Sequence, residues 1–208
     1  ETGLVKVTIS TMSYIRTLSN GDKKLLKELV DLHKMIFPDS LQNLFGDRYL
    51  MRSFYWFMLN HEKRGILVYE QGGRIIGFLT MRYSDDIDNF LKYIYKTIIW
   101  CVISQPSLLL KFSLMKKILN HLKPTKSWRT EKNHLELVTI GVLPSLVKKG
   151  IGKRLLKEFE KYAKNEEVSL VKLRVLKENK KATKFYLSNG WLKKEISIGE
   201  YDLFEKNI

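Results

Sequence analysis

The sequence predicts an α/β protein in which helices flank a sheet with parallel strands, and three observations carry that prediction. Over residues 135–204 the apolar pattern alternates between strand and helix, and parallel strands require such crossovers. The turn Gln71-Gly72-Gly73 separates two apolar runs and predicts a β-hairpin. The chain has 208 residues, 44% of them hydrophobic and 28% charged, a globular composition that excludes a disordered chain. We therefore expect one domain over residues 1–208.

The N-terminal part of the chain predicts one strand and two helices before the hairpin. A weak alternation predicts an edge strand at Val5–Ser10. Asp22 is placed to cap a helix that runs from Lys23 to about Phe37 with one apolar face. A second helix, rich in aromatic residues, is predicted from Asp47 or Arg48 to Asn60.

The hairpin strands, Gly65–Glu70 and Arg74–Tyr83, are followed by a segment of different character at about residues 84–130. Within it, Phe90–Ile103 is mostly apolar or aromatic, and Ser107–Leu122 has the pattern of a basic amphipathic helix. Neither run reaches the about 18 consecutive apolar residues that are needed to cross a bilayer. We interpret the segment as a helical insertion, and three uses stay open: a membrane-surface helix, a lid over a substrate cleft, or two helices packed on the domain.

Residues 135–208 have the clearest pattern. Four strands are predicted there: Leu135–Leu143, Ser169–Leu176, Trp191–Ile198 and Glu200–Phe204. One helix follows Gly150-Ile151-Gly152, and a shorter one over Lys180–Ser188 is closed by Asn189-Gly190, a typical left-handed C-cap. Together with the strands of the first half, the pattern gives six to seven strands.

The composition limits the classes of partner and site. Cys101 is the one cysteine and the four histidines are not spaced as ligand pairs, so we expect no disulfide framework and no metal. The start at Glu1 has no signal-peptide pattern, and we expect a cytoplasmic protein. The net charge of +15 favours phosphorylated cofactors, nucleic acid or anionic lipid. A solvated basic surface explains the same charge equally well.

The loop that leads into the helix after strand 135–143 has the residues of an anion site. Glycines at a helix start let backbone N–H groups approach a ligand, and the first-turn N–H groups and the helix dipole attract negative charge. Lys148, Lys149, Lys153 and Arg154 add cations around Gly150-Ile151-Gly152. The loop is not a Walker A sequence, because its glycine spacing and its ending differ. It therefore favours diphosphate binding over a purely structural turn.

Two separate motifs lie in this half of the chain. The first is Val147-Lys148-Lys149-Gly150-Ile151-Gly152, and the second is Asn179-x-x-Ala182-x-x-Phe185-Tyr186-x-x-x-Gly190-Trp191. Together they resemble the GNAT superfamily of acyl-CoA-dependent N-acetyltransferases, whose loop reads (Gln/Arg)-x-x-Gly-x-(Gly/Ala). Val147 departs from that pattern. The resemblance is strong over residues 134–198, agrees in element order over 5–83 and does not extend to 84–130.

The resemblance implies a GNAT-like mixed central sheet flanked by helices, with a helical insertion between the third and fourth strands, and acetyl-CoA as the co-substrate. The fourth and fifth strands of this fold splay apart, so the backbone of Ile140 and Val142 would pair with the pantetheine arm. Asn179 would hydrogen-bond the pantetheine, and its alternative is a helix N-cap. The pyrophosphate would lie on the loop, whose residues are Val147, Lys148, Lys149, Gly150, Ile151, Gly152 and Lys153.

The implied reaction is the direct transfer of an acetyl group from acetyl-CoA to a primary amine. An alkylamine must lose a proton before it attacks, and a carboxylate or a chain of waters can take that proton. We predict Glu136 as this base, because some family members keep a catalytic Glu on the same strand. We predict Tyr186 as the acid that protonates the departing thiolate. Their alternatives are an exposed strand residue and a buried aromatic beside Phe185.

The amine acceptor is the least defined part of the prediction. The aromatic and basic insertion resembles that of GNAT-like proteins of bacterial surface-glycan synthesis, which favours a nucleotide- or lipid-linked amino sugar. Peptide and protein amines stay open. A non-enzymatic alternative is a degenerate fold that binds RNA or anionic membrane, although the chain lacks an RNA-recognition signature and we expect no nucleic-acid partner. Residues 90–122 are the candidate for contact with the inner face of the membrane, and the oligomeric state is not predicted.

Overall fold

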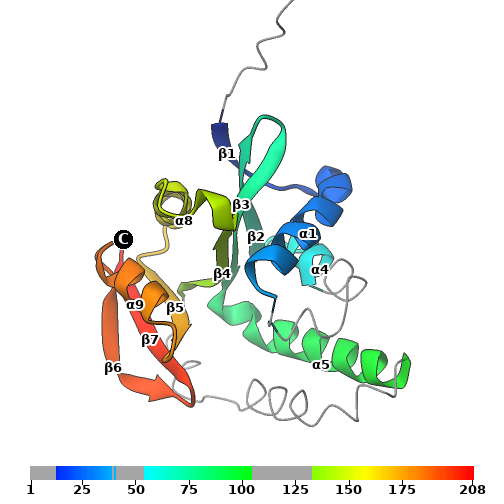
Figure 1. The fold of residues 1–208 in the computed structure, drawn as a ribbon. Helices are drawn as coiled ribbons and strands as arrows, with labels where there is room; N and C mark the ends of the chain where they lie inside the picture. The colour runs from blue at the N-terminus through cyan, green and yellow to red at the C-terminus, as the bar shows by residue number, and fades with distance from the viewer. Residues whose placement is uncertain (1–12, 39, 41–53, 105–132) are drawn as a thin grey trace, which may run out of the picture.

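Seven strands form one mixed sheet in the order β1-β2-β3-β4-β5-β7-β6 (Figure 1). The computed structural model describes residues 13–38, 40, 54–104 and 133–208. The strands are β1 Ser13–Thr17, β2 Arg64–Gln71, β3 Arg74–Tyr83, β4 Leu135–Val142, β5 Leu170–Leu176, β6 Leu192–Ile198 and β7 Tyr201–Asn207. Only β4 and β5 are parallel among these neighbours. The predicted α/β class with six to seven strands is confirmed.

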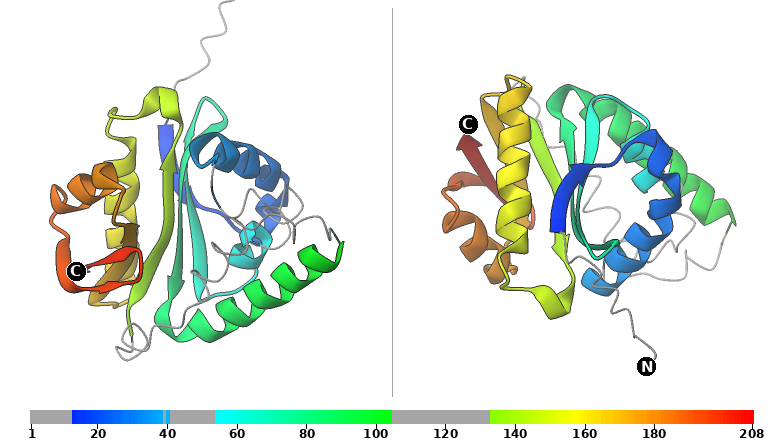
Figure 2. Two further views of the ribbon diagram at one scale, coloured as in Figure 1. Left: turned by 60° about the horizontal axis from the view of Figure 1, so that its bottom comes forward. Right: turned by 90° about the horizontal axis from the view of Figure 1, so that it is seen from above.

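Helices cover both faces of the sheet, with α8 and α9 on one side and α1, α4 and α5 on the other (Figure 2). The α-helices are α1 Leu26–Ile36, α4 Trp56–Leu59, α5 Ile87–Ser104, α8 Ile151–Asn165 and α9 Lys180–Leu187. Short 3-10 turns are η1 Asn20–Leu25, η3 Ser84–Asp86 and η5 Pro144–Leu146. Helix α8 supplies the crossover that the parallel pair β4 and β5 requires.

Each face of the sheet has its own hydrophobic core. On the α8 side, Leu155 and Phe159 recur at helical spacing and pack with Leu137 and Leu173 of the two parallel strands. On the opposite side, residues of α1 and α4 such as Leu29 pack against Phe78 of β3 and its neighbours. The core on the α8 side holds Leu137 and Leu173, so the neighbouring residues Glu136 and Arg174 face the α1 side of the sheet.

Most local predictions are confirmed. Gly72 and Gly73 of the β2–β3 turn have positive φ values of 58° and 74°, and Gly190 after α9 has a φ of 80°. The predicted helix over Phe90–Ile103 is confirmed within α5, which starts three residues earlier. Three predictions lie wholly or partly outside the described residues: the strand at Val5–Ser10, most of the helix from residue 47 to 60, and the helix at Ser107–Leu122.

The predicted cap of the first helix is wrong. Asp22 lies inside η1, and the N-cap of α1 is Leu25. The carboxylate of Asp22 instead accepts a hydrogen bond from the Ser19 backbone N–H at 2.8 Å and pairs with Arg16 at 3.0 Å. Because Arg16 and Ser19 hold this carboxylate, Asp22 stabilises the turn before the helix and not the helix start.

Among the described residues, no helix is long and apolar enough to cross a membrane.

His33 makes the stability of this fold depend on pH. It is buried on α1, and its Nδ1 lies 2.6 Å from the Tyr55 hydroxyl. Burial lowers the pKa of His33 to about 4, so the unfolded chain takes up a proton on this residue at a higher pH than the folded chain does. The free energy of unfolding should therefore be full above pH 6.5 and fall as the pH drops toward 4, by about 2 kcal/mol from pH 7 to pH 5 through this residue.

Urea denaturation at pH 7 and pH 5 checks this for the native protein and for His33→Gln, which cannot titrate. Buried His134 also has a lowered pKa, for which burial is the main cause, so the variant should keep part of the pH dependence and lose the part that His33 supplies. An equal drop in both proteins would contradict the assignment.

Candidate active site

The loop between β4 and α8 is built to expose backbone N–H groups. After η5, Val147 is extended and 55% exposed, Lys148 has a φ of 72°, and Gly150 has a φ of 80°. The left-handed conformation at Gly150 favours glycine, which explains this residue at the helix start. The predicted loop geometry therefore holds, although Val147 offers no polar side chain where the family pattern has one.

The start of α8 is ready to accept an anion. Gly150 is the N-cap of α8 and has no side chain that could accept hydrogen bonds from the N–H groups of the first turn. A Cβ placed on Gly150 would meet no other atom within 4 Å, so the space in front of it is open. Lys148, Lys149 and Lys153 are exposed around this space. Unsatisfied N–H groups, a helix dipole and mobile cations at one point fit a diphosphate.

The strands β4 and β5 part from one another within the sheet. They pair only over Leu135–Leu137 and Val171–Leu173, although both strands continue. Val138 is the extra residue of a bulge, since Thr80 faces Thr139 and Met81 faces Leu137. A bulge bends and twists its strand, which accounts for the divergence at this residue. We call the point between Leu137 and Val138, where pairing stops, the vertex.

The backbone of β4 beyond the vertex faces the opening. Leu143 N–H donates to Ile76 C=O at 2.8 Å. In this part of β4, Leu143 and every second residue before it therefore bond to β3. Because bonding direction alternates along an antiparallel pair, the backbone groups of Ile140 and Val142 point away from β3, toward the gap beside β5. Both residues are only partly buried. An extended chain carrying amide groups could therefore pair here as a strand would.

Helix α9 and its N-cap carry the two polar residues predicted from the second motif. The Asn179 side-chain oxygen accepts from the Ala182 backbone N–H at 3.0 Å, so Asn179 is the N-cap of α9, and its Nδ2 group remains a donor. Tyr186 is buried among aromatic rings, including Trp191 and Phe204. Burial raises the pKa of Tyr186, so its hydroxyl keeps its proton at neutral pH.

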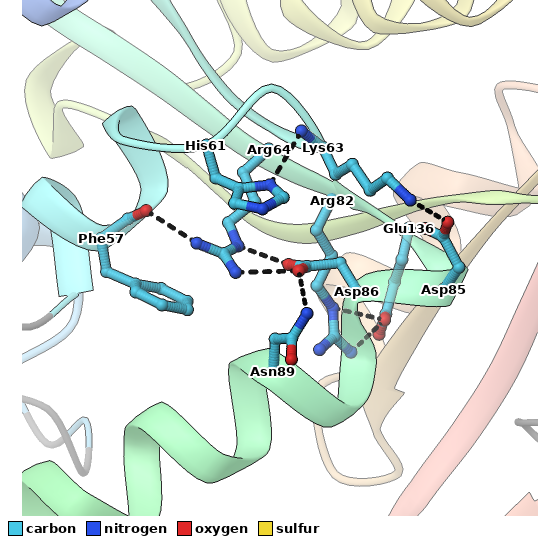
Figure 3. A network of polar contacts seen from close by, with 9 residues as sticks. All are labelled: Phe57, His61, Lys63, Arg64, Arg82, Asp85, Asp86, Asn89 and Glu136. Atoms are coloured by element: carbon cyan, nitrogen blue, oxygen red, sulfur yellow. Dashed lines mark hydrogen bonds and ion pairs between the residues drawn. The ribbon is translucent and has the colours of Figure 1, made fainter.

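Glu136 occupies a buried ion pair beside the vertex (Figure 3). Its Oε2 accepts from Arg82 Nε at 2.9 Å, and its Oε1 accepts from Arg174 Nε at 3.1 Å. Burial alone would raise the pKa of Glu136, but the charges of Arg82 and Arg174 outweigh burial and lower it to about 2. A carboxylate so stabilised has little affinity for the proton of an amine. This environment argues against the base role predicted for Glu136.

The ion-pair network continues to the start of α5. Arg64 of β2 donates to Asp86 at 2.8 Å and lies 3.5 Å from the centre of the Phe57 ring, and Asn89 also contacts Asp86 (Figure 3). The Phe57 ring in turn stacks on Tyr93 of α5 with 3.8 Å between centres. These contacts attach the first turns of α5 to β2 on the α1 side of the sheet, next to Arg82 and Glu136.

The sequence predictions missed the basic members of this network. Arg82 and Arg174 lie within otherwise apolar strands, β3 and β5. A charged residue inside such a run is the one signal that could have identified them, because buried charges need partners. Their common partner becomes known only from the register of β3, β4 and β5.

Comparisons with known proteins agree with this geometry. The model of the acetyltransferase (GNAT) family matches residues 26–191. None of the curated proteins matches the sequence.

Several solved structures have the same fold. PaiA N-acetyltransferase from Thermoplasma acidophilum, in complex with coenzyme A, is 18% identical over 95% of this chain and 99% of its own, with a TM-score of 0.59. The ribosomal-protein-S18-alanine N-acetyltransferase from Escherichia coli is 14% identical over 95% and 94%, with a TM-score of 0.56. Arabidopsis thaliana NAA60 in complex with acetyl-CoA is 18% identical over 95% and 99%, with a TM-score of 0.55.

At such identities these structures show the fold, whereas the family model covers most of the chain, both predicted motifs included. The chain therefore belongs to the GNAT family of acetyltransferases and is an acyl-CoA-dependent N-acetyltransferase.

Proposed function

We propose that the protein transfers the acetyl group of acetyl-CoA to a primary amine by direct attack within a ternary complex. The observation that carries this proposal is the opening of β4 from β5 beyond Leu137, directly in line with the loop at the start of α8. The pyrophosphate would bind the N–H groups after Gly150. The pantetheine arm would then run back along β4, bonding to Ile140 and Val142.

This path fixes where the thioester lies. The distance from Val142 back to Val138 is about 13 Å at the rise of an extended strand. The arm ends where pairing between β4 and β5 closes the gap, so the thioester lies at the vertex. The α8 face of the vertex is filled by core residues such as Leu137 and Leu173. The amine therefore approaches from the face that carries Glu136 and Arg174.

The chemistry needs three groups, and we assign them as follows. A backbone N–H of β4 beyond the bulge polarises the thioester carbonyl as negative charge develops on its oxygen. Tyr186, which its buried site keeps protonated, donates to the departing thiolate. A chain of waters takes the proton of the attacking amine, because Glu136 is held by Arg82 and Arg174. No covalent enzyme intermediate is involved.

For the acceptor, we propose a nucleotide- or lipid-linked amino sugar first and a peptide or protein amine second. The net charge of +15 supports an acceptor that carries phosphate. The name of the Escherichia coli neighbour, an enzyme for an alanine of ribosomal protein S18, supports the peptide alternative. The fold accommodates either class.

Direct attack predicts intersecting double-reciprocal plots when acetyl-CoA and the amine are varied together. Release of free thiol measures the rate, with amino-sugar nucleotides screened before peptides. Parallel plots would indicate an acetylated enzyme intermediate and would contradict the ternary complex.

Gly150→Glu should abolish the stabilisation of the protein by acetyl-CoA. The new carboxylate would fill the open space in front of α8 and repel the diphosphate. At a concentration of 100 times Kd the native protein should gain about 2.7 kcal/mol, seen as a raised melting temperature. Gly73→Glu is the matched control, because Gly73 also has a positive φ, of 74°, and open surroundings. Equal ligand stabilisation in the two variants would refute the loop assignment.

Tyr186→Phe should lower kcat at least tenfold with little change in the Kd of acetyl-CoA, because only the hydroxyl is lost. Tyr162→Phe on α8 is the control for loss of a partly buried hydroxyl in the same core. Steady-state rates and calorimetric Kd values for both variants provide the measurement. An undiminished kcat in Tyr186→Phe would show that another group protonates the thiolate.

A further inference from the structure

Helix α5 packs on the domain with one side and is exposed on the other. Tyr93 stacks on Phe57, and Thr97 is buried. Residues spaced three and four apart lie on one side of a helix. The exposed residues of α5 at this spacing, which we call its outer face, are Lys92, Tyr95, Lys96, Ile99, Trp100 and Ile103.

The second half of the outer face is apolar. Ile99 is 58% exposed, Trp100 is 49% exposed and Ile103 is 71% exposed. A single exposed apolar side chain is common in proteins, whereas neighbouring ones on one face indicate a contact with a partner or a membrane. These three residues are neighbours on one side of the last turns of α5.

The apolar half of the outer face lies at the periphery of the domain. The contacts of Asp86 with Arg64 and of Tyr93 with Phe57 hold the first turns of α5 to the domain. A helix of 18 residues is about 27 Å long. Figures 1 and 2 show the C-terminal end of α5 extending outward past α1. A large, flat partner can therefore reach this end.

The charges of this part of the chain suit an anionic partner. Lys92 and Lys96 lie on the outer face beside the apolar residues, and Asp88 is the one acidic residue of α5. After Asp88 the sequence has seven lysines and one arginine before the next acidic residue, Glu131. The acidic residues just before α5 are already paired, Asp85 with Lys63 and Asp86 with Arg64.

A lipid surface fits the outer face better than a second copy of the chain does. Two α5 helices packed antiparallel would bury the lysines of each copy against apolar residues of the other, and parallel packing would bring like charges together. The headgroup region of a leaflet instead offers phosphate and acyl chains side by side. Tryptophan and lysine suit that region, because each has an apolar body and a polar tip.

We propose that the outer face of α5 binds an anionic membrane surface. Ile99, Trp100 and Ile103 enter the boundary between headgroups and acyl chains, and Lys92 and Lys96 lie at the lipid phosphates. Helix α5, like the other described helices, is not long and apolar enough to cross a bilayer, so the contact is with one leaflet. The inference does not rest on the proposed reaction, although it favours the lipid-linked member of the proposed acceptors.

The first test is flotation of the full chain with vesicles of phosphatidylglycerol and phosphatidylcholine in equal parts, compared with vesicles of phosphatidylcholine alone. The native protein should bind the mixed vesicles at least tenfold more strongly. Ile99→Gln should weaken that binding at least fivefold, because an apolar side chain is lost from the lipid. Ile196→Gln is the matched control, since Ile196 is 60% exposed on the edge strand β6, and it should bind as the native protein does.

The control separates the outer face from the general attraction of a chain with a net charge of +15 to anionic lipid. Equal binding of Ile99→Gln and Ile196→Gln, or no binding of the native protein to the mixed vesicles, would overturn the inference. Equal binding to both kinds of vesicle would overturn the anionic character of the surface. A native dimer that does not bind vesicles and that Ile99→Gln dissociates would assign the face to a second copy.

A second measurement reports the depth of Trp100 and does not depend on a change in affinity. Brominated phosphatidylcholine in the mixed vesicles quenches the fluorescence of a tryptophan that enters the acyl region. Trp100→Phe should lose more of the quenching seen in the native protein than Trp56→Phe does, although Trp56 is also exposed, by 42%. Equal quenching in the two variants would overturn the inference.

Discussion

The parallel ladder between β4 and β5 joins only Leu135–Leu137 to Val171–Leu173, and the bulge at Val138 turns the rest of β4 away. This interruption is costly for a sheet, because among the described strands none pairs with the backbone groups of Ile140 and Val142 on that side. The cost is offset when an extended ligand with its own amides takes the place of the strand. The other parts of the site lie at the two ends of this gap. The α8 loop lies at its open end, and Glu136 and Arg174 lie at its closed end.

Beside the vertex, the glutamate that the sequence predicts as a base lies in a buried ion pair. Register places Arg82 directly opposite Glu136, and Arg174 reaches it from the next strand. Burying a charged group is unfavourable unless it is paired and hydrogen-bonded, and here the pairing removes the basicity of the carboxylate. The ion pair holds the side chains of Glu136 and Arg174 together where the pairing of β4 and β5 ends.

The parts of this protein that could be predicted from its sequence are those set by local signals. Gly150 and Gly190 have positive φ values, which favour glycine, so these two helix ends could be predicted from the glycines. The alternation of strand and helix after residue 134 was enough to predict a parallel pair of strands. The start of the first helix could not be predicted, because Arg16 from β1 competes for the carboxylate of Asp22. The environment of Glu136 could not be predicted either, since its partners are 54 and 38 residues away in the chain.

The central claim is that coenzyme A takes the place of a strand beside β4. A crystal structure of the complex with coenzyme A tests it most directly. The account predicts hydrogen bonds between the pantetheine amides and the backbone of Ile140 and Val142. The sulfur atom should lie beside Val138, at the end of the gap where Arg174 stands. Coenzyme A bound elsewhere, or a gap filled by side chains of the protein in that complex, would contradict it.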